Sequence, residues 1–458
     1  MRVTSDDILQ GPLGPTLYRM IKPAVIGQFF LMSFGAVDTY FIGLMGSEEL
    51  AAITFTMPIN LLIYSLMFGL GIAVSILIGD VVGQRGERHA GGASTASLLL
   101  CSLIILMISL IGYLTIEPLF TLMGASDSTL PHIKDYMSIW YAFGFLLLMP
   151  VIGNSILRAM GDTRWPSFIM VAVGFANACL DPILIFGFGP IPAMGIEGAA
   201  FATVISWLLA CVALFWILCF REKLIDVKSL GDLPLLFSYW KKLLKLGLPI
   251  STSNIMTPIA TAALTWLVAQ HGDKAVAGLG AGSRVEFFAM SVSFAMATSL
   301  SPFMAQNIGA GNLQRVRDSL CACIKFTILF QLGAVVFFAG ASPWLAQIFT
   351  SDPEVVAYAQ LYLIIMPLGM AFFAVLMVFN TAFNSYQQSN LTLSSNATRV
   401  FIFYIPLIFL GNLMFGLIGI FIACVLANVL GTLLGWYIYR KTSFYAKTQL
   451  LPPAPEAA

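Results

Sequence analysis

Long apolar runs dominate the sequence and determine which elements are expected. A helix needs about 20 mostly apolar residues to cross ~30 Å of hydrocarbon. Runs of that length predict helices at 18–44, 52–79, 93–115, 134–158, 166–188, 196–219, 245–269, 277–304, 320–341, 356–383, 392–412 and 416–439. The longest polar stretch, 220–244, separates them into two sets. The pattern predicts an all-α membrane protein with twelve transmembrane helices.

The composition supports lipid as the main solvent of this chain. Only 10% of its residues are charged, 59% are hydrophobic and the mean hydropathy is +0.90. A soluble domain carries roughly 25% charged residues. With a net charge of +1 and no basic stripe, nucleic acid is not an expected partner. The seven cysteines lie in apolar segments without metal-binding or redox spacing, and the N-terminus lacks the features of a removable signal peptide.

The distribution of Lys and Arg predicts the orientation in the membrane. Basic residues gather on the even-numbered connections, at Arg85, Arg88, Arg158, Arg164, in 220–244, and at Arg315 and Arg317. Positive loops stay on the cytoplasmic side. We therefore expect a multi-pass protein of the bacterial inner membrane, with both termini in the cytoplasm.

The two halves of the chain resemble each other. A shift of 226 positions aligns Pro23 with Pro249, Ser75 with Ser301, Gly83 with Gly309, and Asn154 with Asn380; with small slips, Pro182 meets Pro406, and Gly195 with Gly198 meet Gly416 with Gly419. Parallel six-helix repeats are typical of secondary transporters, although a duplicated scaffold without a transport role is an alternative. The predicted organisation is an N-terminal lobe (1–219), a cytoplasmic linker (220–244), a C-terminal lobe (245–440) and a cytoplasmic tail (441–458) with a disordered end.

Two acidic residues lie where an apolar environment is expected. Asp38 is deep in the first predicted helix and Asp181 in the fifth. Each costs about 2.5 to 3.5 kcal/mol on insertion scales, so each needs a partner or a cavity. Asn177 shares a helical face with Asp181, and Pro182 bends the helix and leaves upstream carbonyls free. Such a group can bind a proton or a sodium ion; the alternative is that both carboxylates only join helices through hydrogen bonds.

This carboxylate pair belongs to the first half alone. Under the repeat, Asp38 meets Leu264 and Asp181 meets Ile405. We expect a specialised ion site in the N-terminal lobe, where Gly35, Gly43 and Pro182 are candidates for hinges or bends. No structural metal is predicted.

Further polar residues are candidates for a substrate cleft. Arg284 and Glu286 can form an ion pair near the outer interface. The alternative is that Glu286 faces the substrate and attracts a cationic drug. The remaining cleft candidates, for which packing hydrogen bonds are the alternative, are Gln28, Asn60, Asn154, Asn254 and Asn380, together with the aromatic Phe34.

Several motifs resemble those of the multidrug and toxic compound extrusion (MATE) family over nearly the full length. They are VDTYFIGLMGSEELAA in the first helix, GDVVGQRGERHA and its repeat SLSPFMAQNIGAGNLQRVR after the second and eighth, and ILRAMGDTRWP after the fourth. The resemblance implies two six-helix lobes that form a V-shaped cleft. It also implies export of drugs and toxic organic cations, driven by inward flow of protons or sodium ions, by a monomer in the lipid bilayer that needs no other cofactor.

The chain is most similar to the DinF-type branch, which uses an acidic cluster in the N-terminal lobe. Asp38, Asn177, Asp181 and Thr203 match that cluster. The branch often has a Tyr where this sequence has Phe34, and the missing hydroxyl leaves the hydrogen bonding of Asp38 open. Glu286 is similar to an acid of NorM-type members, so the choice between H⁺ and Na⁺ also stays open.

Two other functions remain alternatives. A flippase for lipid-linked precursors needs several basic residues in its cleft to hold pyrophosphate, and few Lys or Arg residues, among them Arg399 and Lys325, lie within the predicted spans. An intramembrane enzyme needs a catalytic set, whereas the three histidines lie near the ends of segments and no nucleophile–base arrangement is found. We therefore expect a transporter and not an enzyme.

Overall fold

The structure is a computed structural model of the chain, and it describes residues 3–45, 47–125, 129–348 and 352–442. Within these ranges the side chains of 31–40, 42–43 and 47–51 are not described. The terminal residues 452–458, predicted to be disordered, lie outside the described part of the chain.

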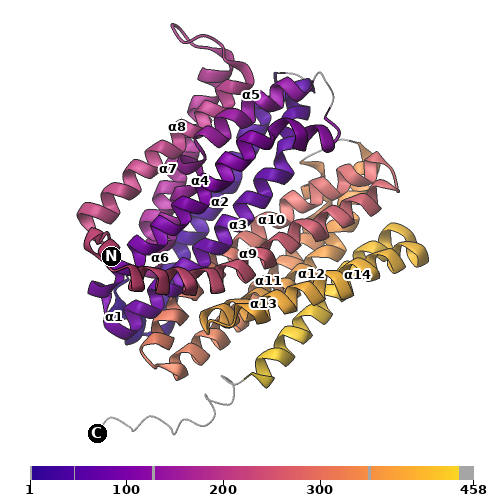
Figure 1. Ribbon diagram of the computed structural model, residues 1–458. Helices are drawn as coiled ribbons and strands as arrows, with labels where there is room; N and C mark the ends of the chain where they lie inside the picture. The colour runs from indigo at the N-terminus through magenta and orange to yellow at the C-terminus, as the bar shows by residue number, and fades with distance from the viewer. Residues whose placement is uncertain (1–2, 46, 126–128, 349–351, 443–458) are drawn as a thin grey trace. The chain divides into compact units, whose positions relative to one another are not determined.

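The regular elements of the described residues are helical (Figure 1). The helices are α1 (Ser5–Leu9), α2 (Leu13–Gly43), α3 (Ser47–Arg85), α4 (Ala90–Leu122), α5 (Thr129–Ala142), α6 (Gly144–Ala159), α7 (Arg164–Phe186), α8 (Gly195–Trp216), α9 (Leu233–Ala269), α10 (Asp273–Gly309), α11 (Leu313–Gln347), α12 (Pro353–Ser385), α13 (Ser389–Ala397) and α14 (Ile405–Lys441). Short 3₁₀ or π turns occupy Glu87–His89, Ile217–Arg221, Val227–Gly231 and, as η4, Thr398–Tyr404.

These helices account for the twelve predicted spans. In the described residues, eight helices are long and apolar enough to cross a membrane, or nine if the bent pair α5 and α6 is one span. The last of them, 389–441, contains non-helical backbone at Phe415 and Gly416, which divides it into the two predicted spans. The remaining two are α2, with 31 residues, and α9, with 37.

Two local features differ from the apolar pattern. The predicted helix 134–158 is two helices that meet at Phe143 with a bend of 51°, because the backbone of Phe143 leaves the helical conformation. The polar stretch 220–244 also ends inside a helix, since α9 begins at Leu233. Here the buried Tyr239 and the indole of Trp240, which donates to the carbonyl of Ala96 at 3.0 Å, attach the first turns of α9 to α4.

By their packing, the described residues form two compact units. The first contains the residues up to Ile8 and Tyr18–Ser251, and the second contains Leu9–Leu17 and the residues from Thr252 onward. The change of unit falls inside α9. The functional lobes at 1–219 and 245–440 stay a prediction.

The backbone repeats in the same places as the sequence. Gly195 and Gly416 open corresponding helices with φ of 58° and 57°, a conformation that glycine adopts without a steric penalty. Gly161 and Gln387, which the 226-residue shift aligns, also have positive φ, at 80° and 61°. Matching left-handed turns in both halves mean that the chain changes direction at equivalent points.

Candidate functional site

Three of the predicted cation-site residues lie together in the first unit, between α7 and α8. The amide nitrogen of Asn177 donates to Asp181 Oδ1 at 3.3 Å and to Thr203 Oγ1 at 3.5 Å. The Thr203 hydroxyl donates to the carbonyl of Ala199 one turn earlier, so its oxygen faces Asn177 as an acceptor. Asn177 thus joins an acid of α7 to a hydroxyl of α8.

A glycine brings the two helices close enough for this contact. A Cβ at Gly198 of α8 would lie 2.4 Å from the carbonyl oxygen of Leu184 in α7. Real Cβ atoms do not approach backbone atoms this closely, so the observed crossing requires glycine. The second unit also contains a glycine at a close backbone approach, because a Cβ at Gly419 would lie 2.0 Å from the carbonyl oxygen of Gly411.

The helix that carries Asp38 runs beside α7 in the same unit. Near one end, a Cβ at Gly27 of α2 would lie 2.9 Å from the Cα of Ser167. Near the other end, the rings of Phe41 and Phe186 meet edge to face with centroids 6.5 Å apart. Both contacts follow the chain direction, so α2 and α7 run parallel and meet at these two points.

These two contacts also define the level of each acid along its helix. Asp38 precedes Phe41 by three residues, or about 4.5 Å, and Asp181 precedes Phe186 by five, or about 7.5 Å. The backbones at the two acids thus lie within about one turn of the same height. The side chains of Asp38 and Phe34 lie outside the described ones, so their pairing with Asp181 stays a prediction, as do the hinge roles of Gly35 and Gly43.

Asp181 has the environment expected of an ion-binding acid. Its side chain is 0% exposed within a membrane-spanning helix. A carboxylate in such a place is stable only when it is protonated or balanced by a cation and hydrogen bonds. Pro182 follows it within a continuous α7 and leaves the carbonyl of residue 178 without its usual helical donor. The oxygens of Asp181, Asn177 and Thr203 are ligands suited to a proton or a sodium ion, and the described residues hold no cluster of three or more His, Cys, Asp or Glu.

In the second unit, Glu286 is buried and does not pair with Arg284. Its Oε2 accepts from the hydroxyl of Tyr362 at 2.5 Å, and its side chain is 3% exposed. Arg284 is exposed, and the described residues contain no ion pair between it and Glu286. Sequence reasoning missed Tyr362, because 76 residues separate it from Glu286.

The polar cleft candidates are distributed over both units, and their role stays a prediction. Gln28, Asn60 and Asn154 belong to the first unit, and Asn254 and Asn380 to the second. The buried Oδ1 atoms of Asn154 and Asn380, which the repeat aligns, both have no hydrogen-bond partner among the described residues. The Asn380 amide instead donates to Asn396 at 3.3 Å, and Asn396 donates to Ser253.

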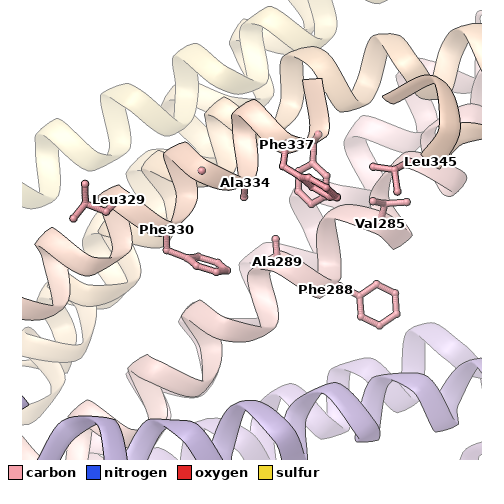
Figure 2. A pocket seen from close by; sticks show the side chains of 10 residues that line it. Val285, Phe288, Ala289, Leu329, Phe330, Ala334, Phe337 and Leu345 are labelled. Carbon is pink, nitrogen blue, oxygen red and sulfur yellow. The ribbon is translucent and has the colours of Figure 1, made fainter. Parts of the chain in front are cut away.

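An apolar groove lies elsewhere in the second unit, between α10 and α11 (Figure 2). Its volume is about 590 Å³, and its lining is formed by Val285, Phe288, Ala289, Leu329, Phe330, Gly333, Ala334, Phe337, Phe338 and Leu345. Figure 2 shows the rings of Phe288, Phe330 and Phe337 around this space. None of these lining residues has an ionisable or hydrogen-bonding side chain, so the groove is not an ion site.

Comparison with known proteins agrees with the repeat and the helical arrangement. A sequence model of the MatE family matches residues 23–183 and again residues 249–410. The two matches begin at Pro23 and Pro249, the prolines that the 226-residue shift aligns. The chain belongs to the MATE family of transporters. It is therefore a multi-pass membrane protein with the twelve-helix MATE fold and not an enzyme.

The names of individual MATE-family relatives indicate different transported compounds. The chain is 35% identical over 434 residues to a FAD transporter of Shewanella oneidensis, with coverage of 95% of this chain and 96% of the relative. It is 24% identical to the multidrug export protein MepA of Staphylococcus haemolyticus, with coverage of 91% of each chain. A mutant of the MATE transporter VcmN of Vibrio cholerae has a similar structure, with a TM-score of 0.89, 30% identity, and coverage of 95% of this chain and 98% of VcmN.

Proposed function

We propose that this MATE transporter exports organic compounds, often cationic and amphipathic, in exchange for inward H⁺ or Na⁺ by alternating access. The observation that carries the proposal is the fully buried Asp181, hydrogen-bonded through Asn177 towards Thr203 inside a membrane-spanning helix pair. Its partner in the proposal is Asp38 on α2, the helix that runs beside α7. The excess of Lys and Arg on one side supports cytoplasmic termini in an inner membrane.

The coupling cation acts through the charge of this cluster. With neither proton nor sodium bound, two neighbouring carboxylates in a low-dielectric site repel each other and lack solvation. Uptake of a cation from outside removes both penalties and lets α2 pack closely against α7. A change in the bend of α2, which contains Gly35 and Gly43, then lowers the affinity for cargo that has reached the outward-facing side, and release of the cation to the cytoplasm resets the cycle.

A flavin dinucleotide is a second candidate for the cargo. The observation that favours it is the 35% identity to a FAD transporter over 95% of this chain. The two candidates share the ion-coupled mechanism and differ in the compound exported.

The proposal is tested in liposomes that contain the purified protein. Efflux of ethidium and of FAD is measured under an imposed proton gradient and, separately, under a sodium gradient. We expect one gradient to drive efflux of at least one compound, and Asp181→Asn to abolish that efflux because the amide cannot exchange a proton and holds a cation weakly.

The matched control is Asp162→Asn. Asp162 is also buried in the first unit, but its Oδ1 accepts from the backbone of Arg164 and Trp165 at the start of α7. Asparagine keeps that oxygen, so efflux should persist. Gradient-driven efflux at the wild-type rate in Asp181→Asn would refute the coupling role, and equal loss in both variants would point to a folding defect.

A further inference from the structure

The second unit contains an arginine in the interior of its helix bundle. Arg399 lies in the π-helical turn η4 between α13 and α14, and it is 4% exposed. This turn is part of the apolar segment 389–441, one of the candidate membrane spans. Single π turns in α-helices are frequent at functional sites. The proposed export cycle makes no use of this residue.

No acidic side chain that the structure describes forms an ion pair with Arg399. One terminal nitrogen donates to Asn428 Oδ1 at 3.0 Å, and the guanidinium lies 4.5 Å from the ring centroid of Phe373. Both partners are uncharged. Among the described residues no carboxylate lies within ion-pair distance, and the buried Nε has no hydrogen-bond partner.

The surrounding helices hold the side chain in place. A Cβ at Gly431 of α14 would lie 2.7 Å from Arg399 Cγ, so the absence of a side chain at Gly431 makes room for the arginine stem. Phe373 of α12 covers one face of the guanidinium, and Asn428 of α14 binds one edge. The donor geometry is thus fixed before any ligand arrives.

A buried cation without a counter-charge is costly, and a guanidinium cannot avoid that cost by losing its proton. The electrostatic gain from an incoming anion is correspondingly large in a low-dielectric site. Arginine presents a planar set of donors that matches the oxygens of phosphate or carboxylate groups. The free Nε is one such donor. An arginine that served only as packing would be expected to have all its buried donors satisfied.

We propose that Arg399 is a binding residue for a phosphoryl group, so that the second unit recognises phosphorylated, anionic compounds. This inference rests on the proposed export function, in which it favours the second candidate, a flavin dinucleotide, over a cationic cargo. The phosphoryl group can belong to a soluble compound or to the headgroup of an anionic lipid, and the bilayer supplies the latter.

Binding to the purified full-length protein in nanodiscs tests this without any ion gradient. The probes are riboflavin 5′-phosphate and riboflavin, which share a fluorescent ring and differ by one phosphate. In phosphatidylcholine discs we expect wild type to bind the phosphate ester at least tenfold more tightly, about the effect of one charge-assisted hydrogen bond. Arg399→Gln should remove this preference and leave riboflavin binding unchanged, and Arg399→Lys should keep part of it because the charge remains.

Arg158→Gln is the matched control, because Arg158 is also in a helix but donates to Ser155 in its own turn. This variant should keep the preference. A second arm adds phosphatidylglycerol to the discs: if the lipid headgroup is the ligand, this lipid raises the unfolding temperature of wild type and not of Arg399→Gln.

Equal affinity of wild type for the two flavins, with no effect of phosphatidylglycerol, would overturn the proposal. Parallel loss of both ligands in Arg399→Gln and Arg399→Lys would also overturn it, since that result indicates a structural role. Failure of gradient-driven export would instead contradict the proposed function and leave these binding results intact.

Discussion

The close crossing of α7 and α8 predicts that Gly198→Ala destabilises the protein and weakens the hydrogen bond between Asn177 and Thr203. The added methyl group would lie 2.4 Å from the carbonyl oxygen of Leu184 and 2.6 Å from its carbonyl carbon. Both are backbone atoms, so no side-chain rotation can relieve the contact. The helices must separate or the backbone must bend.

The size of the effect follows from these distances. Ordinary contact begins at 3.4 Å, so α8 must move by about 1 Å at this level. Overpacking of this kind costs about 1 to 3 kcal/mol in the free energy of unfolding. The Asn177 to Thr203 hydrogen bond is already 3.5 Å long, and the same displacement breaks it. Loss of one net hydrogen bond, about 1 kcal/mol, should weaken binding of the coupling cation about fivefold.

Three variants separate the two effects. Gly198→Ala should lower the unfolding temperature and raise the cation concentration needed for half-maximal efflux from liposomes. Thr203→Val removes the hydroxyl but not the close helix contact, so it should show the second effect with little of the first. Gly340→Ala is the control, because nothing lies within 4 Å of a Cβ at that position of α11. Wild-type stability and cation dependence in Gly198→Ala would show that the crossing does not control the site.

Two further predictions concern stability outside the proposed sites. The backbone N–H of Glu354 and the ammonium of Lys274 hold the pKa of Asp352 below its ordinary value. Their stabilising effect is therefore present above about pH 4 and is lost as the pH falls through the lowered pKa. If so, Lys274→Met should reduce the drop in unfolding temperature between about pH 7 and pH 3. Trp240→Phe removes the donor to the Ala96 carbonyl and should destabilise the first unit by about 1 kcal/mol, as measured by thermal unfolding. A free energy of unfolding within about 0.3 kcal/mol of wild type would mean that water replaces this hydrogen bond.

Apolar run length predicted the helices and their number because the requirement to cross the bilayer acts on each segment separately. It did not predict the break at Phe143 or the start of α9 at Leu233. The polar segment before residue 245 becomes helical because Tyr239 and Trp240 pack inside the first unit.

The candidate site shows the same limit. The contact of Asn177 with Asp181 followed from helical spacing, since residues four apart share a face. The contact of Tyr362 with Glu286 could not be read from the sequence, because it joins different helices. The alignment of Gly198 with Gly419 in the repeat marked two positions at which helices approach each other closely. Their partners, Leu184 and Gly411, could be identified only from the structure.

The geometry of the first unit indicates which part can respond to the coupling cation. Asn177 and Asp181 share α7, and Gly198 fixes α8 against the same helix, so Thr203 cannot move away from them without breaking a backbone contact. By comparison, α2 approaches the backbone of α7 closely at Gly27, but near its other end it meets α7 through the edge of the Phe41 ring. Aromatic edge contacts tolerate sliding more readily than interlocked backbones, because their energy changes little over small displacements. We therefore infer that cation binding moves the Phe41 end of α2 relative to a rigid α7–α8 pair, while the close approach at Gly27 stays fixed. A disulfide that joins α2 to α7 near Phe41 should stop transport, whereas one that joins α7 to α8 should not.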